Sequence, residues 1–259
     1  MLGSLALAAA FFLPAALAAQ GVAAPEPARP DLEGLYAEVD ALHARRDEPG
    51  VEQRIQEELE AAEKSAPGDY GVLWRLARLH SWRSEDPSLS GKEKSRRGKR
   101  AWDYAERAIQ ANPARVEGFF YAAAGMGNYS LGIGILKALS QGIERKFKDR
   151  LSRAEKADPN FDSGAIPTAW GRFWFKLPWP KHDARKSRRA LERALEMNGD
   201  NVRAHVYLAE LHEKEDRTNE ARAEWERAAA AKPGRYDAPE ERRWQAVARA
   251  RLAADTNRR

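Results

Sequence analysis

Apolar and small residues recur along residues 202–233 with the periodicity of two helices separated by a short polar turn. Residues 216–219 supply the turn, and Pro233 ends the second helix because proline cannot continue a helical hydrogen-bond ladder. The packing positions are His205, Leu208, Ala209 and His212 in the first helix, and Ala221, Trp225 and Ala228 in the second. The pattern predicts one complete helix-turn-helix unit.

The second-helix spacing of four, three and five residues recurs in four more segments. These are Ile55, Leu59, Ala62 and Pro67; Ala101, Ala105, Ala108 and Pro113; Phe147, Leu151, Ala154 and Pro159; and Ser187, Leu191, Ala194 and Gly199. The whole unit resembles a tetratricopeptide repeat (TPR), a pair of antiparallel helices of about 34 residues. We therefore expect an all-α, right-handed solenoid of five helix pairs over residues 35–235.

The successive terminators from Pro67 to Pro233 stand 46, 46, 40 and 34 residues apart, so the early units exceed the usual period. We place the excess between paired helices, as insertions at residues 81–100, 127–146 and 175–186. After the last unit, residues 236–259 are expected to form a capping helix and tail. The helix, over 239–254, carries Trp244, Val247 and Leu252 and would close the exposed end of the solenoid.

Residues 1–19 contain no charged side chain and end in small residues, which indicates a signal peptide cleaved after Ala18 or Ala19. An uncleaved membrane anchor is the alternative, because about 20 apolar residues suffice to span a bilayer. Residues 20–34, rich in proline and alanine, are interpreted as a linker. Export to the periplasm or secretion follows from the first interpretation, and an intracellular scaffold is the second choice.

Composition limits the chemistry that this chain can perform. The 44 Lys and Arg residues nearly balance 39 Asp and Glu residues, and the net charge of +5 gives weak support for nucleic-acid binding. The chain has no cysteine, which excludes disulfides, thiol catalysis and lipid attachment to cysteine. The sequence contains neither a phosphate-binding loop nor a nucleophile elbow. We expect neither enzymatic activity nor a cofactor.

Two histidines on one predicted helix raise the question of a metal site. His205 and His212 lie two turns apart, with Glu210 and Glu213 nearby, but the His-Glu-x-x-His arrangement is absent. Both positions coincide with packing positions of the repeat. We interpret them as partly buried, hydrogen-bonded histidines and expect no metal.

The insertions are the candidate surfaces for partners. In 127–146, glycines alternate with Tyr129, Leu131, Ile133, Ile135 and Leu136, and glycine permits close approach of another chain or a ligand. The alternative is a helix extension packed against the neighbouring unit. As a hypothesis, residues 131–139 contribute a partner or subunit contact.

Two further sets of side chains are candidates. Lys94, Arg96, Arg97, Lys99 and Arg100 in the first insertion could contact an acidic partner or an anionic lipid surface. The alternative is a solvated loop leading into a helix. In the third insertion, Phe175 and Trp179 are expected to be exposed and to anchor a peptide or apolar ligand. Trp170 and Trp174 are expected to pack in the core.

The C-terminal half resembles the T-component proteins of bacterial TRAP transporters. The residues that carry this likeness are Asp158-Pro159, Gly164-Ala165, Gly171, Leu177-Pro178, Ala184, Leu191, Ala194-Leu195 and Pro239-Glu240, with residues 246–252. The resemblance implies a periplasmic repeat protein that forms trimers and pairs with a substrate-binding protein for an apolar ligand. Members are often lipoproteins, which a chain without cysteine cannot be.

The middle of the chain is similar to the regulator of microtubule dynamics family. The matching residues are Glu117-Gly118-Phe119-Phe120-Tyr121-Ala122, Gly127, Lys137-Ala138-Leu139, Gly142, Lys146, Leu151, Ala154, Asp158 and Pro159. Those are eukaryotic repeat proteins, so the resemblance implies a shared architecture rather than a shared function. Together these observations predict an exported scaffold that binds a protein or peptide in the cell envelope. A TRAP-like accessory role, homo-oligomers and peripheral membrane contact stay open, and nucleic acid is not expected.

Overall fold

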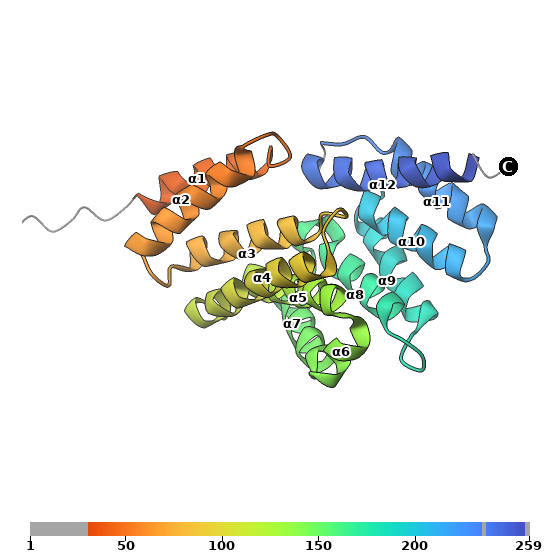
Figure 1. Ribbon diagram of the computed structural model, residues 1–259, viewed down its shortest axis with the longest axis horizontal. Coiled ribbons are helices and arrows are strands. Elements are labelled where there is room, and N and C mark those ends of the chain that lie inside the picture. Colours follow the sequence, from red (N-terminus) through yellow and green to blue (C-terminus); the bar gives the residue numbers. More distant parts are fainter. Residues whose placement is uncertain (1–30, 235–236, 257–259) are drawn as a thin grey trace, which may run out of the picture.

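The structure is a computed structural model that describes residues 31–234 and 237–256. Helices follow one another in a curved array, with the N-terminal pair and the last helix lying at the same edge (Figure 1). The elements are α1 (Leu32–His43), α2 (Val51–Ser65), α3 (Tyr70–Ser84), α4 (Gly91–Ala111), α5 (Val116–Ile133), α6 (Ile135–Ser140), α7 (Ile143–Ala157), the 3-10 turn η1 (Phe161–Gly164), α8 (Ala165–Lys176), α9 (Ala184–Met197), α10 (Val202–Lys214), α11 (Thr218–Ala230) and α12 (Ala238–Thr256).

The five predicted helix pairs are confirmed. They are α1 with α2, α3 with α4, α5 with α7, α8 with α9, and α10 with α11, and α12 follows them. Short elements α6 and η1 are additions to this plan. The expected signal peptide and most of the linker lie outside the described residues. Within the described ranges, no helix combines the length and apolar content needed to cross a bilayer.

Helix starts are fixed by short polar side chains, as the capping rules require. The side chains of Asp69, Asp183 and Asn201 accept hydrogen bonds from backbone N–H groups in the first turns of α3, α9 and α10. Ser90 and Glu93 form a reciprocal capping box at the start of α4. Side-chain caps therefore mark the starts of the first helices α3 and α10 and of the second helices α4 and α9.

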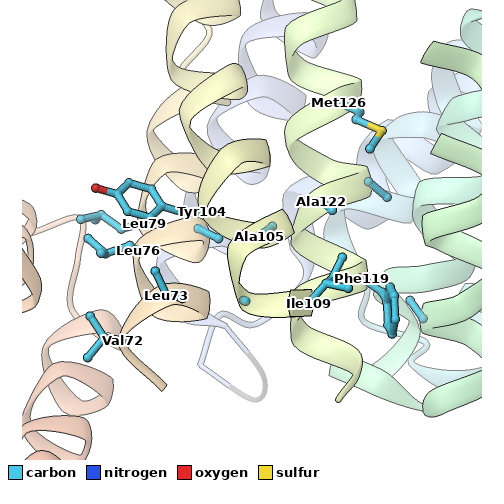
Figure 2. Close-up of a cluster of buried hydrophobic side chains, with 14 of the residues drawn as sticks. Val72, Leu73, Leu76, Leu79, Tyr104, Ala105, Ile109, Phe119, Ala122 and Met126 are labelled. Carbon is cyan, nitrogen blue, oxygen red and sulfur yellow. The ribbon is translucent and has the colours of Figure 1, made fainter. Parts of the chain in front are cut away.

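Apolar side chains between successive helices form two clusters that together make the core. Figure 2 shows Leu73 and Leu76 of α3, Ala105 of α4, and Ala122 and Met126 of α5 in the first cluster. The second cluster, built around Leu191, Leu211 and Trp225, lies in the C-terminal pairs. Positions chosen from the repeat spacing, such as Leu59, Ala105, Leu151 and Ala194, are fully buried.

Helices α4 and α5 approach so closely that glycine is required at their contact. A Cβ atom built on Gly125 would lie 2.5 Å from the backbone nitrogen of Trp102, and one on Gly98 would lie 2.6 Å from that of Tyr129. Further along α5, Gly132 meets Gly91 and Ser95 with equally short separations. Real Cβ atoms do not tolerate such distances, because packed interiors leave no free space.

The first two insertions lengthen helices more than they lengthen loops, whereas most of the third is the loop between α8 and α9. Residues 91–100 are the first half of α4, residues 127–133 extend α5, and residues 135–140 form α6. The glycines of the second insertion therefore serve different purposes: Gly132 packs α5 on α4, whereas Gly134 and Gly142 have positive φ and separate the helices. We expected these glycines to permit close approach of another chain or a ligand, but Gly132 permits close approach of α5 to α4 within this chain.

A matched pair of substitutions on α5 tests the glycine contact. Gly125→Ala should lower the free energy of unfolding by about 1–3 kcal/mol, the usual cost of overpacking a filled interior. Gly127→Ala, whose nearest contact would be an ordinary 3.6 Å from Phe147, should be neutral or raise stability by up to about 1 kcal/mol through helix propensity. Urea unfolding of both variants measures this, and equal effects would show that the contact is looser than described.

Two tryptophans provide a test of the core. Trp225 is 3% exposed and donates from Nε1 to Glu213 at 2.8 Å, whereas Trp179 is 89% exposed. Trp225→Ala should cost about 3–5 kcal/mol, the range for emptying a large buried site. Trp179→Ala should stay within about 0.5 kcal/mol of the parent. A loss below about 1 kcal/mol for Trp225→Ala would contradict its role in packing.

Candidate ligand pocket

A pocket of about 220 Å³ lies on the concave side of the solenoid, between its first repeats and its last helix. One wall is apolar and aromatic, and comes from α5 to α8. Its residues are Phe120, Tyr121, Leu131, Ile135, Ala138, Leu139, Ile143, Phe147, Phe173 and Leu177. The opposite wall is charged and comes from the α1–α2 turn, α3, η1, α8, α10 and α12. Its residues include Arg46, Arg78, Glu85, Asp162, Arg172, Arg203, Asp237 and Glu240.

Helix α12 closes this pocket because it turns back toward the first repeats (Figure 1). Arg203 on α10 joins Glu85, which follows α3, at 2.5 Å and Glu240 on α12 at 2.8 Å. Arg46 pairs with Asp237 at 2.6 Å. Capping of the last repeat was expected, but the contact between α12 and the first repeats was not.

A second set of contacts supports the same closure from outside. Arg242 forms a bidentate pair with Asp47, at 2.6 and 2.8 Å. The Arg243 guanidinium stacks 3.1 Å from the Trp82 ring centroid and donates to the Trp82 carbonyl oxygen at 2.8 Å. Such planar, bidentate and stacked arrangements are those for which arginine is better suited than lysine.

Burial changes the protonation of the acids in the charged wall. It raises the pKa of Glu240 to about 8, and Glu85 and Asp237 add to this effect while Arg203 opposes it. Burial likewise raises the pKa of Asp162, with Asp237 contributing in the same direction. Carboxyl groups crowded in a site of low polarity favour the neutral form. At pH 7 the Glu240 carboxyl therefore favours its neutral form and offsets less of the arginine charge than its count as an acid suggests.

Several residues that line the pocket carry a buried side-chain N–H donor that has no hydrogen-bond partner within the described residues. These donors are Nε of Arg46, Arg78, Arg172 and Arg203, and Nε1 of Trp244. Arg46 is only 3% exposed. Guanidinium and indole N–H groups donate and cannot accept, and an unsatisfied buried donor costs about 1–3 kcal/mol. The charged wall therefore has hydrogen-bond donors that the described residues leave unused.

The predicted surface in the second insertion is divided by the structure. Leu131 and Ile135 line the pocket. Tyr129 and Ile133 are half-buried and pack against the first core cluster. Leu136 alone of the five projects away, with 74% of its side chain exposed.

The two aromatic candidates of the third insertion differ in their exposure to solvent. Trp179 is exposed as expected. Phe175 is half-buried against the second core cluster and lies edge-on to His182, so the expectation of an exposed anchor was wrong there. Arg172, Lys176 and Lys214 cover its ring with their charged ends.

The basic set lies on the first half of α4, and four of its members bind within the chain. Lys94 donates to the carbonyl oxygen of Ser84 at 3.0 Å, and Arg97 to that of Arg83 at 3.3 Å. These cations satisfy the C-terminal end of α3, where the helix dipole favours positive charge. Lys99 pairs with Asp103 and Arg100 with Glu60, and Arg96 is exposed. The loop of this insertion is limited to residues 85–90, and the five basic residues lie on the helix that follows it.

His205 is held by its own repeat. Its Nδ1 lies 2.6 Å from Glu224 and its Nε2 lies 3.0 Å from the carbonyl oxygen of Gly199. His212 is buried, but its Nδ1 has no partner among the described residues. No group of three or more His, Asp or Glu residues in the described ranges is arranged to hold a metal ion.

The most informative pocket residues were not singled out from the sequence. Arg46, Arg203, Asp237 and Glu240 lie on helices or turns rich in charge, where residues that face solvent and residues that face a groove form the same local pattern. Trp244 was expected on the capping helix, but not in contact with a ligand site. Glu85 and Arg203 are 118 positions apart. Such a pair gives no pattern that can be recognised in the local sequence.

The fold and its concave pocket define a helical repeat protein of the TPR type. The fold is shared with the crystal structure of TTC0263, a thermophilic TPR protein in Thermus thermophilus, with a TM-score of 0.61 and 19% sequence identity. The match covers 83% of this chain and 97% of that chain.

The family model described as Regulator of microtubule dynamics protein 1-3 matches residues 35–253. The chain belongs to this family, and the match extends well beyond the middle segment that suggested it. No curated protein matches the chain.

The raised pKa of Glu240 predicts a pH dependence of stability. Below about pH 8 the folded chain holds a proton on Glu240, whereas an unfolded glutamate, with a pKa of about 4.3, has lost it. Since the folded state binds more protons, this contribution decreases as pH rises toward and through the folded pKa. Between pH 7 and pH 9 the melting temperature of the parent should fall more than that of Glu240→Gln. Parallel pH profiles would show that Glu240 has no raised pKa.

Proposed function

We propose that this chain is a binding protein without catalytic activity, exported to the cell envelope, whose pocket takes part of a peptide or protein partner. The part that fits best is a chain end: one or two apolar side chains followed by a free carboxylate. The apolar wall accommodates the side chains, and the arginine-rich wall accommodates the carboxylate. Binding of this kind requires neither a nucleophile nor a cofactor.

The observation that carries this proposal is the set of buried, unpartnered N–H groups on one wall of the pocket. Arg46, Arg78 and Arg203 come from three different elements and line the same space, and the Nε–H of each is buried without a hydrogen-bond partner among the described residues. A carboxylate has two oxygens and about four lone-pair sites. Hydrogen bonds to a charged group contribute about 1.5–3 kcal/mol each, so even two would distinguish a free carboxylate from an amide.

A chain end is favoured over a long extended peptide because α12 closes one side of the groove. Open TPR-type solenoids bind along a concave surface lined by their first helices. Here the pairs Arg203–Glu85 and Arg46–Asp237 connect the two ends of that surface. The cavity of about 220 Å³ is also below the usual range of about 300–1,000 Å³ for drug-sized ligands.

A second candidate is a small molecule with an apolar body and an anionic end, handed to or from a substrate-binding protein in a TRAP-like role. The enclosure and size of the pocket favour it, because a small ligand needs no opening for a continuing chain. Adjacent genes for a TRAP permease and binding protein would support this candidate, and their absence would favour the peptide.

The proposal of export is supported by residues 1–19, which are uncharged and end in small residues. Periplasmic fractionation followed by N-terminal sequencing tests it. A mature chain beginning at Ala19 or Gln20 is expected. A chain that keeps its first residues and sediments with membranes would favour the anchor instead.

The pocket is tested by calorimetry with short peptides ending in Phe or Leu. Amidation of their C-terminus should weaken binding by about 10–100-fold, the equivalent of about 1.5–3 kcal/mol. Ala124→Leu fills the pocket from α5 and should weaken binding at least about tenfold. Ala41→Leu, at an exposed site on α1, is the matched control and should change nothing.

Two outcomes contradict the peptide proposal. Equal affinity for free and amidated peptides would show that the arginine wall does not receive a carboxylate. Binding of alkyl carboxylates that is lost in Ala124→Leu, without any binding of peptides, would establish the small-molecule candidate instead.

A further inference from the structure

Two large apolar side chains project from one edge of the molecule. Leu136 of α6 is 74% exposed, and Trp179 in the α8–α9 loop is 89% exposed. An ion pair between Lys181 and Glu144 connects the two segments that carry them. Figure 1 shows α6 and the loop between α8 and α9 protruding at the lower edge of the array. We call residues 135–146 and 176–186 together the tip.

Local structure holds both side chains outward. Helix α6 is bounded by Gly134 and Gly142, both with positive φ, and it turns Ile135 and Leu139 into the pocket. Leu136 lies on the solvent-exposed side of this short helix. In the loop, the backbone N–H groups of Lys181 and His182 donate to the carbonyl oxygen of Pro178, at 2.9 and 3.0 Å. This tight turn places Trp179 at its apex.

The surroundings of these two side chains are strongly basic. The tip contains seven Lys and Arg residues against two acids, Glu144 and Asp183. Both acids are already engaged: Glu144 pairs with Lys181 and Lys148, and Asp183 caps α9 and pairs with Lys186. The remaining basic residues of the tip are the exposed Lys137, Arg145, Lys146 and Arg185, and the half-buried Lys176.

We propose that the tip docks on an anionic lipid bilayer, with Leu136 and Trp179 inserted among the headgroups. Tryptophan is enriched at membrane–water interfaces because its ring is apolar and its N–H is polar. Lys and Arg side chains near an anionic surface add electrostatic attraction to it. This surface is independent of the ligand proposed for the pocket.

A protein partner fits the tip less well than a membrane does. Protein interfaces have a continuous apolar centre from which charged residues are depleted. At the tip the two apolar side chains stand apart among lysines and arginines, which suits shallow insertion into a fluid, negatively charged interface. A second copy of this chain would bring like charges together.

The absence of cysteine allows each position to be labelled singly. Leu136→Cys, Trp179→Cys and the control Gln53→Cys, at an exposed site on α2, would each carry an environment-sensitive nitrobenzoxadiazole dye. With vesicles of equal phosphatidylglycerol and phosphatidylcholine, emission should shift to the blue at positions 136 and 179 only. With phosphatidylcholine alone, or in high salt, the shift should largely disappear.

Sedimentation with vesicles tests the native side chains. Trp179→Ala and the double variant Arg145→Gln, Lys146→Gln should each reduce the bound fraction severalfold, while peptide binding in the pocket is unchanged. The membrane proposal is overturned by the absence of a spectral shift at both tip positions or by equal shifts at position 53. It is also overturned if light scattering without vesicles shows dimers that Trp179→Ala abolishes, since the tip would then be a subunit interface.

Discussion

The pocket depends on the interaction of Arg203 with two carboxyl groups that come from opposite ends of the chain. Glu85 follows α3 in the second repeat, and Glu240 begins α12 after the last repeat. A solenoid of stacked pairs has contacts only between neighbours, so its two ends have no inherent reason to meet. The two ion pairs of Arg203 connect these ends. With Arg46 and Arg243, Arg203 converts a curved array with an open concave side into a molecule with a partly enclosed pocket.

This closure is chemically demanding because it places charge where water is scarce. Breaking a buried pair by removing one partner leaves the other uncompensated, which costs more than the pair itself contributes. Burial raises the pKa of Glu240 and of Asp162, which favours the neutral form of both carboxyl groups. The same low polarity strengthens any hydrogen bond that a ligand makes with the unpartnered arginine N–H groups. Closure and the binding that we propose for the pocket therefore rely on the same residues.

Close packing of α4 on α5 determines what faces the pocket from the other side. The glycines at positions 91, 98, 125 and 132 allow two unusually long helices to remain in contact along their length. Helix α5 thereby extends past the usual end of a repeat helix and carries Leu131 to the pocket. Gly134 then redirects the chain into α6, so that Ile135 and Leu139 point inward and Leu136 points outward. One insertion thus supplies both the pocket wall and half of the tip.

The sequence by itself determined the repeat. Spacing of small and apolar residues identified five helix pairs and a closing helix, because each pair must bury the same stripe against the next and the spacing of that stripe is a local property. It also identified residues 127–146 and 175–186 as unusual, and Trp179 as exposed. It could not separate Leu131, which lines the pocket, from Ile133, which packs in the core, since adjacent turns of one amphipathic segment look alike.

Only the tertiary structure decided where the charged residues act. Five repeats accumulate enough curvature to bring α12 to α3, and this allows Glu85 to meet Arg203 and Asp47 to meet Arg242. The curvature is a sum of small rotations between helix pairs, which no single segment encodes. The basic residues of α4 also show that sequence alone does not identify the partners of charged side chains. Lys94 and Arg97 resembled a binding patch, yet they donate to the carbonyl oxygens at the end of α3. Helical periodicity depends on residues that are close together in the sequence, whereas the pocket is formed by residues that are far apart in the sequence.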